Sequence, residues 1–223
     1  MKYLLITSAL FVNFLGCNKK IESEKGGIDV ISNIYLNASK GLDEVQTIHI
    51  SNLNYNKGQI LELIPVHDAP DFIEDIYLIE NDVVYQAPST IPGEIVFSDL
   101  RKENQKSVYQ KTNGVVFLKD SVPYNYEHGR ILKDTILFGK HYMRYEINSP
   151  ESYSRYYLYK TDTILPYSLY NQLEKRFNGR LERIDSYDKK QDIFISMQLI
   201  PRKDWDETAK EIFEYNHYLE NRN

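Results

Sequence analysis

The sequence has little of what marks several common classes of protein. A single cysteine in 223 residues excludes an intramolecular disulfide and a zinc site built from cysteines. The 27 basic side chains stand against 32 acidic ones, so the formal net charge is −5 and no basic footprint for nucleic acid exists. The apolar run at 3–15 is shorter than the about 20 residues that a membrane-spanning helix needs. We therefore expect no nucleic-acid partner and no spanning helix from this run.

Motifs for catalysis and metal binding are missing as well. The five histidines show no His-Glu-x-x-His spacing, and the chain has no Gly-x-Ser-x-Gly elbow or glycine-rich phosphate loop. His67-Asp68 is the one adjacent pair of histidine and carboxylate, and its flanking Pro65 and Pro70 favour a loop. We expect a protein that is not an enzyme, with no catalytic residue, metal or cofactor.

What the sequence has in excess is tyrosine. Nineteen tyrosines accompany nine phenylalanines and one tryptophan, and aromatic residues reach 13% of the chain. Tyrosine suits a pleated surface with one wet side, so this composition favours β-structure. At 42% hydrophobic and 26% charged residues, the chain has the composition of a folded globular protein.

The first seventeen residues read as an export leader. Met1-Lys2 is a positive start, and the apolar run 3–15 has the length of the apolar part of a signal peptide. The run ends at Phe14-Leu15-Gly16-Cys17, which resembles the lipobox of bacterial lipoproteins, with Phe14 where that family prefers leucine. The resemblance implies removal of residues 1–16 and lipid attachment, including palmitate, at Cys17. The alternative is a buried N-terminal strand with a chance cysteine.

The resemblance also implies a location. Two or three acyl chains anchor a protein stably to a bilayer, whereas one does not. Asn18 stands where an aspartate resembles an inner-membrane retention signal, which favours the outer membrane, with the periplasmic and surface orientations both open. Residues 17–27, charged and ending in two glycines, are interpreted as a flexible tether, and 28–223 as one domain.

Periodicity predicts two helices around a set of strands. Ile28, Ile31 and Ile34 recur at helical spacing and predict an amphipathic helix over 28–39. Asp204 as N-cap, with Glu207 three residues later, predicts a second helix that runs to about 220. The strands are predicted at 45–54, 59–66, 72–79, 83–87, 94–98, 107–111, 115–119, 135–138, 141–148, 153–160, 164–176, 180–187 and 191–200.

Turn residues and alternation organise these strands. Hairpin turns are predicted at Asn81-Asp82, Asn113-Gly114, Gly139-Lys140 and Asn178-Gly179, so the last five strands should form an antiparallel meander. In 141–148 the apolar residues share one face, while Arg144, Glu146 and Asn148 take the other. The strand 191–200 has a similar apolar face. The apolar residues of these two faces are Met143, Tyr145, Ile147, Ile193, Ile195, Met197 and Leu199.

Two further patterns have a functional and a structural interpretation. The tyrosines at 153, 156, 157, 159, 167 and 170 form either an aromatic contact surface or the ordinary wet edge of a tyrosine-rich sheet, and the second is favoured. Three Asp-Ser/Thr-apolar triplets, centred on Ser121, Thr135 and Thr163, resemble a short O-glycosylation signal of envelope proteins and are also common turn chemistry.

Two stretches resemble the LolA/LolB-like lipoprotein-carrier superfamily. The segment 30–48 resembles that family's first helix, which ends near a glycine, here Gly41, and leads into the first strand. In 156–169 a strand ends at Lys160-Thr161 and resumes at Leu165-Pro166, as in that family's hairpin. The resemblance implies a mainly β (α+β) fold, with a single strongly curved antiparallel sheet, an open half-barrel, around the N-terminal and C-terminal helices. Members of that family hold acyl chains in the cavity of this sheet.

The resemblance gives the leading functional hypothesis. We expect a membrane-anchored envelope lipoprotein that binds or carries a hydrophobic ligand, lipid or lipoprotein acyl chains, in a cavity lined by the seven apolar residues named above. The alternative is a scaffolding module that contacts another envelope protein through its tyrosine-rich sheet. A third alternative is an envelope hydrolase with an unrecognised site, tested by changing His67 or His128. The oligomeric state stays open.

The anchor is directly testable. Changing Cys17→Ser removes the thiol that forms the thioether, so the protein should leave the membrane fraction for the soluble fraction on cell fractionation. Retention of that variant in the membrane fraction would rule out lipidation as the anchor.

Overall fold

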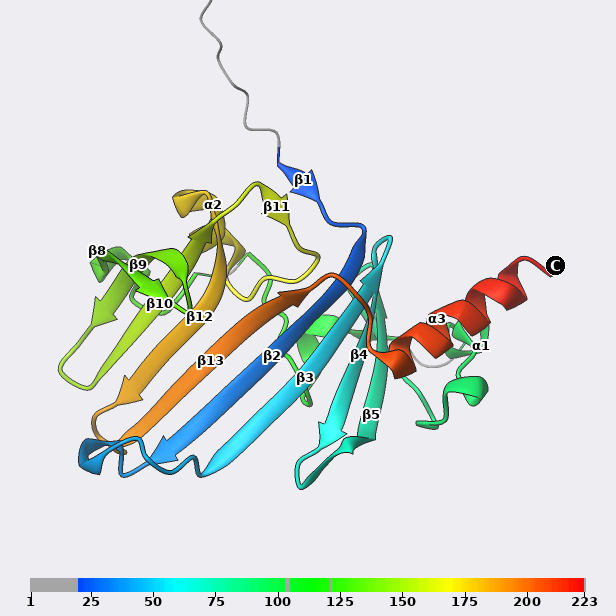
Figure 1. Ribbon diagram of the computed structural model, residues 1–223, viewed down its shortest axis with the longest axis horizontal. Coiled ribbons are helices and arrows are strands. Elements are labelled where there is room, and N and C mark those ends of the chain that lie inside the picture. Colours follow the sequence, from blue (N-terminus) through cyan, green and yellow to red (C-terminus); the bar gives the residue numbers. More distant parts are fainter. Residues whose placement is uncertain (1–19, 103–104, 121, 223) are drawn as a thin grey trace, which may run out of the picture.

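The computed structural model describes residues 20–102, 105–120 and 122–222, and one large antiparallel sheet dominates it (Figure 1). Its eleven strands follow the order β7-β6-β5-β4-β3-β2-β13-β12-β10-β9-β8, and the sheet does not close on itself. The strands are β2 (Lys25–Leu36), β3 (Thr47–Asn56), β4 (Gln59–Val66), β5 (Ala69–Glu80), β6 (Val83–Gln86), β7 (Lys106–Ser107), β8 (Arg130–Leu137), β9 (Lys140–Asn148), β10 (Ser152–Lys160), β12 (Gly179–Asp188) and β13 (Ile193–Arg202).

The remaining elements are short, apart from the last helix. A separate parallel pair joins β1 (Ile21–Glu22) to β11 (Thr163–Ile164). The α-helices are α1 (Phe97–Leu100), α2 (Asn171–Phe177) and α3 (Glu207–Glu220), and the 3₁₀ turns are η1 (Ala38–Lys40), η2 (Pro92–Glu94), η3 (Val108–Gln110) and η4 (Tyr126–His128). The prediction of a mainly β fold with one antiparallel sheet is confirmed.

The two faces of the sheet are covered differently. On one face, which we call the α3 face, Leu61, Leu63, Ile76 and Leu78 of β4 and β5 pack with α1 and α3. The opposite face, the loop face, carries two apolar clusters that irregular segments cover. In Figure 1 α3 lies at the right of the sheet, beyond β4 and β5, and leaves β8, β9, β10, β12 and β13 uncovered by a helix of this kind.

The helix predicted over 28–39 is wrong, because this segment is β2 at the centre of the sheet. Cross-strand register places Ile28, Val30 and Ile34 on the loop face and Ile31 on the α3 face. Since both faces of a central strand meet apolar neighbours, isoleucines fall on both, and their spacing imitates a helix. The β-branched residues of the segment also favour a strand.

The sheet begins within the segment interpreted as a tether. Gly26 and Gly27 belong to β2, where a Cβ at Gly26 would lie 2.6 Å from the Tyr55 hydroxyl, and one at Gly27 would lie 2.7 Å from the Arg202 guanidinium. The two glycines therefore allow close packing rather than flexibility. Residues 17–19 of that segment, and the predicted leader 1–16, lie outside the described residues.

Four predicted strands are wrong in whole or in part. The segment 94–98 forms the end of η2 and the start of α1, and 107–111 is mostly η3. Residues 115–119 form no regular element, and 164–176 leaves the extended conformation after Ile164 and enters α2. Several of their apolar residues are buried against the loop face or beneath α3 rather than in a sheet ladder, so burial without pairing misled the prediction. These residues are Ile95, Phe97, Val108 and Val115.

The hairpin predictions have mixed outcomes. Asn81 and Asp82 both have positive φ, 50° and 63°, and join β5 to β6 as predicted. The β8–β9 turn is one residue earlier than predicted, at Phe138-Gly139. Asn178 is instead the left-handed C-cap of α2, and Asn113-Gly114 lies in a loop over the sheet. Glycine and asparagine indicate a residue with positive φ. Because helix C-caps and loops also require positive φ, these residues alone do not identify a hairpin turn.

The predicted C-terminal helix exists, but it begins two residues later than the capping pattern suggested. Asp206 is its N-cap residue, and the Asp206 carboxylate lies 3.0 Å from Arg202 rather than on a helix N–H. Helix α3 buries Ala209, Ile212 and Phe213 against the sheet. None of the helices in the described ranges has the length and hydropathy of a membrane span.

Candidate ligand-binding site

Two irregular segments cover the loop face of the sheet. The first covering segment, 105–120, buries Val108 and Val115, and the second, 161–178, buries Tyr167, Leu169 and Leu173. The first therefore completes the cluster over β2 to β6, and the second also completes the cluster over β9, β10 and β12. The first segment begins with β7 at the edge of the sheet and then crosses the loop face, and the second connects β10 to β12.

A buried ion pair fixes the first covering segment to β4. Lys111 Nζ lies 2.9 Å from Glu62 Oε2, and the side chains are 2% and 0% exposed. The other oxygen of Glu62 accepts hydrogen bonds from the Val115 N–H at 2.6 Å and the Ser51 hydroxyl at 3.0 Å. Burial raises the pKa of the Glu62 carboxyl, and Lys111 and these two donors oppose that shift.

A pocket of about 560 Å³ lies between the two covering segments. Phe117 and Leu118 of the first segment, with Ile164, Leu165 and Tyr167 of the second, form its apolar wall. Pockets that take small ligands span about 300 to 1,000 Å³ and have mainly apolar walls with a few polar groups. The pocket has the size and the apolar wall of such a site.

The polar part of the pocket is rich in cations. Lys20, Lys175 and Arg180 contribute to its lining, against Asp82 and Glu174. Burial raises the pKa of the Glu174 carboxyl, although the Leu181 N–H donates to it at 2.7 Å and Arg180 and Lys20 lie close enough to lower it. Lys20 and Arg180, which act on Glu174, and the adjacent Lys175 therefore outnumber the carboxylates at this end of the pocket, and Arg180 also pairs with Glu182 at 2.6 Å.

Two polar groups show how the pocket is built. Asn171 Oδ1 is buried and accepts no hydrogen bond within the part of the chain that the structure describes. A buried acceptor without a donor is costly, so a bound molecule with a donor would be stabilised there. The Tyr167 hydroxyl, by contrast, donates to the Val116 carbonyl at 3.1 Å, which joins the two covering segments, and burial raises the pKa of this phenol.

The seven residues predicted to line a ligand cavity lie on the loop face but not in this pocket. Tyr145, Ile147 and Leu199 are buried, at 1%, 7% and 5% exposure, and belong to the apolar clusters. Met143 and Met197 pack against these clusters, and Ile193 and Ile195 are half-buried. Their role in binding a ligand stays a prediction.

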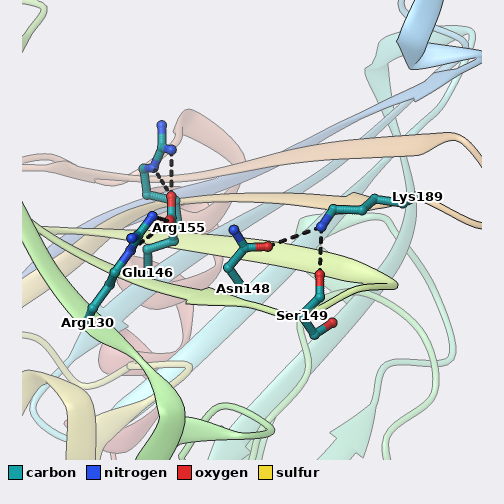
Figure 2. Close-up of polar contacts among 6 residues, drawn as sticks. All are labelled: Arg130, Glu146, Asn148, Ser149, Arg155 and Lys189. Carbon is teal, nitrogen blue, oxygen red and sulfur yellow. Dashed lines mark hydrogen bonds and ion pairs between the residues drawn. The ribbon is translucent and has the colours of Figure 1, made fainter.

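On the other face, Glu146 forms a charged cluster that the alternation pattern did not reveal. Glu146 was assigned to a wet face, yet its side chain is only 5% exposed. Figure 2 shows it between two guanidinium groups, with Arg155 Nη2 at 2.6 Å and Arg130 Nη2 at 2.8 Å. Burial raises the pKa of Glu146, but the hydrogen bonds from Arg155 and Arg130 outweigh it and leave the pKa below its ordinary value.

The same face repeats the arrangement on β12. Glu182 accepts from Arg180, from Lys140 at 3.0 Å and from the Tyr142 hydroxyl at 2.8 Å, and Asp185 accepts from Arg183 at 2.8 Å. The sequence does carry a signal for these pairs, since Arg180 and Glu182, like Arg183 and Asp185, are two residues apart and share a strand face. In Figure 2, Lys189 also ties the β12–β13 turn to Asn148 and the Ser149 carbonyl.

The tyrosine cluster divides between the two faces. Tyr156 and Tyr167 are buried on the loop face, at 4% and 5% exposure. Tyr153, Tyr157 and Tyr159 lie on the α3 face, where Tyr157 is buried and the other two are half-buried. An aromatic surface made of all six therefore does not exist, and of the tyrosines on the α3 face the half-buried Tyr153 and Tyr159 are the ones available for contact.

The remaining predicted positions form no site of their own. His67 Nε2 lies 3.8 Å from Asp68, both side chains are largely exposed, and His128 lies in η4. The described residues contain no group of three metal-ligating side chains. Thr135 and Thr163 lie in β8 and β11, while Ser121 and Cys17 fall outside the described residues.

Comparison with known proteins finds neither a matching protein-family model nor a curated relative. Among solved structures, the chain is similar to an uncharacterized conserved protein from Thermus thermophilus, at 7% identity and a TM-score of 0.39, over 82% of this chain and 83% of that one. It is also similar to a putative outer membrane lipoprotein-sorting protein domain from Vibrio parahaemolyticus, at 13% identity, TM-score 0.27 and coverage of 87% and 91%. A DUF1329 family protein from Desulfovibrio piger matches at 12% identity, TM-score 0.29 and coverage of 84% and 91%.

Removing the cation from the Glu62–Lys111 pair should destabilise the fold. Changing Lys111→Met leaves the Glu62 carboxylate buried without its counter-charge, which costs about 3 kcal/mol in comparable pairs. Urea denaturation at neutral pH measures this loss of unfolding free energy, and hydrogen exchange should show reduced protection of Val115. The double variant Glu62→Leu, Lys111→Met should regain most of the loss, and an equally unstable double variant would contradict this account.

The Glu146 cluster should make stability depend on pH. Because the folded pKa of Glu146 lies below its ordinary value of 4.5, its contribution is complete above pH 4.5 and is lost as pH falls through the folded pKa. Changing Glu146→Gln should cost about 2 kcal/mol of unfolding free energy at pH 7, the scale of hydrogen bonds to charged groups, and progressively less at lower pH. The exposed Glu151→Gln serves as control, and a pH-independent cost would refute this account.

Proposed function

We propose that the protein is an envelope lipoprotein, anchored through Cys17, that binds an amphipathic ligand in the pocket between its two covering segments. The observation that carries the proposal is the composition of this pocket. It joins an apolar wall of Phe117, Leu118 and Leu165 to a group of cations at one end. That division suits a molecule with an apolar chain and an anionic head, such as a fatty acid or a phospholipid.

The position of the pocket along the chain supports this function. Lys20 lines the pocket and is three residues from Cys17. Three residues of chain span at most about 11 Å. An anchor at Cys17 would thus hold the cationic end of the pocket close to the bilayer surface, where amphipathic ligands are found.

The energetics are adequate for this class of ligand. Each buried methylene of an alkyl chain contributes about 0.8 kcal/mol. Six to eight buried methylenes would give about 5 to 6 kcal/mol, and the cations would add to it through the head group. The proposed role is therefore non-enzymatic binding or carriage of the ligand.

A fluorescent fatty acid tests the proposal. The described residues contain all three apolar clusters, so a protein that begins at Asn18 is a suitable sample. Titration with cis-parinaric acid should give saturable binding, which Leu118→Asn should weaken about tenfold by removing about 1.4 kcal/mol of apolar contact. Lys175→Glu should weaken it further at low ionic strength, because it reverses a charge at the cationic end of the pocket.

A matched control uses another exposed leucine. Leu42 is 47% exposed and Leu118 is 38% exposed, but Leu42 does not line the pocket. Leu42→Asn should therefore bind the probe as the unchanged protein does. Equal binding by all three proteins, or the absence of saturable binding, would reject the proposed function.

A further inference from the structure

The α3 face of strands β8, β9, β10, β12 and β13 carries ordered rows of arginine and tyrosine, and we call it the arginine–tyrosine surface. One row runs from Arg130 through Glu146 and Arg155 to Asp185. The next aligns Arg144, Tyr157 and Arg183, and a third aligns Tyr142, Tyr159 and Arg180. Arg155 and Arg183 also lie over the rings of Tyr153 and Tyr157, each at 5.8 Å.

This surface is cationic on a chain of negative net charge. Its rows place five arginines and two carboxylates on one face, and the Lys140–Glu182 pair adds one cation and one carboxylate there, while Lys133 and Asp134 of the β8 bulge offset each other. Glu146 pairs with two arginines, and Glu182 pairs with one lysine and one arginine. Each carboxylate has one negative charge against two positive charges, so each cluster keeps a net positive charge. Arg144 donates to the Lys133 carbonyl and has no ion pair with any described carboxylate.

An apolar pocket opens at one end of the surface. It has a volume of about 320 Å³ between the β8–β9 turn and β13, and its wall includes Leu137, Phe138, Ile200 and Pro201. Phe138 is 82% exposed and has a left-handed φ of 51°, a conformation that bulky residues rarely adopt. The two-residue hairpin turn requires this positive φ, and asparagine or glycine is the usual residue there, so the turn presents an exposed aromatic ring beside the pocket at a conformational cost.

The composition and size of the surface indicate a protein partner. Arginine and tyrosine are enriched in protein interfaces, and binding energy concentrates where an apolar anchor fills a pocket. Tyr142 and Tyr157 of the rows are buried, so the arginines with Tyr153 and Tyr159 form the accessible part of this surface. Five strands at about 4.8 Å spacing and nine residues of about 3.3 Å give about 600 Å². That is less than the about 800 Å² per partner of a standard interface and suits a peptide segment.

We propose that the arginine–tyrosine surface docks an acidic segment of another protein. An apolar side chain of the segment enters the pocket beside Phe138, and its carboxylates pair with Arg144 and with the outer edges of Arg130 and Arg155. The carboxylates of Glu146, Glu182 and Asp185 lie between the cations and repel a uniformly charged polyanion or bilayer. A segment with spaced carboxylates avoids them, and this favours a peptide over a lipid surface.

A labelled peptide in which glutamates alternate with leucine and phenylalanine tests the proposal, with the protein that begins at Asn18. Fluorescence anisotropy should show saturable binding that weakens with salt. Arg144→Glu and Phe138→Asn should each weaken it at least tenfold. Asparagine accepts the left-handed conformation, so Phe138→Asn should melt at or above the temperature of the unchanged protein.

Matched variants and control probes show whether the peptide binds at the arginine–tyrosine surface and through its carboxylates. Phe72→Asn, at a phenylalanine 69% exposed on β5, and Lys203→Glu should leave peptide binding unchanged. The proposal is overturned if the peptide with glutamine in place of glutamate binds as tightly, or if Phe138→Asn has no effect. It is also overturned if vesicles rich in phosphatidylglycerol, or a second copy of this chain in sedimentation, use Arg144 and Phe138 instead. Loss of fatty-acid binding in Leu118→Asn should leave peptide binding unchanged, because Leu118 lines the pocket between the covering segments and not the pocket beside Phe138.

Discussion

The pairing of the first long strand with the last is the constraint on which the rest of this structure depends. β2 and β13 pair over ten residues, from Gly27 with Arg202 to Leu36 with Ile193. The pairing joins β3 to β7 on one side to β8 to β12 on the other, so that the sheet continues across both. Bringing β2 and β13 together closes a long loop of chain, and this closure costs conformational entropy before any contact between the two strands forms. The long register, with apolar side chains on both faces of β2, offsets that cost.

A continuous sheet of this width has two faces to cover, and among the residues that the structure describes α3 is the one long helix that can cover them. α3 covers the part of one face formed by β4 and β5. The loop face is covered by segments with little regular structure, and such segments carry backbone groups and side chains that need partners when buried. Glu62 and Tyr167 meet that need with Lys111, Ser51 and the backbone of 115 and 116. Segments without regular structure also pack less completely, which is why the pocket of about 560 Å³ lies between the two covering segments.

Sequence reasoning succeeded where one period dominates a segment. β3, β4, β9, β10 and β12 alternate or are bounded by turn residues, and each was predicted within a few residues of its observed bounds. It failed for β2, because a strand with two partly covered faces has no clean period of two. It failed again for 115–119, where Val115 is buried without a strand partner and Val116 and Leu118 are exposed. The pocket between the covering segments joins Lys20 to Leu118 and Arg180, and no local pattern reports that three such distant positions meet.

The buried carboxylates show how the two faces came to differ. On the loop face one carboxylate, Glu62, is fully enclosed and has one cation, so the pair serves to hold a segment in place. On the α3 face Glu146 and Glu182 each have two cations whose outer edges remain in contact with water. Coulomb attraction between charges is weaker at a solvent-exposed surface than in the interior. These carboxylates therefore hold the cations in position without neutralising their positive charge. The same chemistry therefore closes one face and leaves the other with an ordered positive charge. A surface of ordered charge is suited to recognition, whereas an enclosed pair is suited to stability.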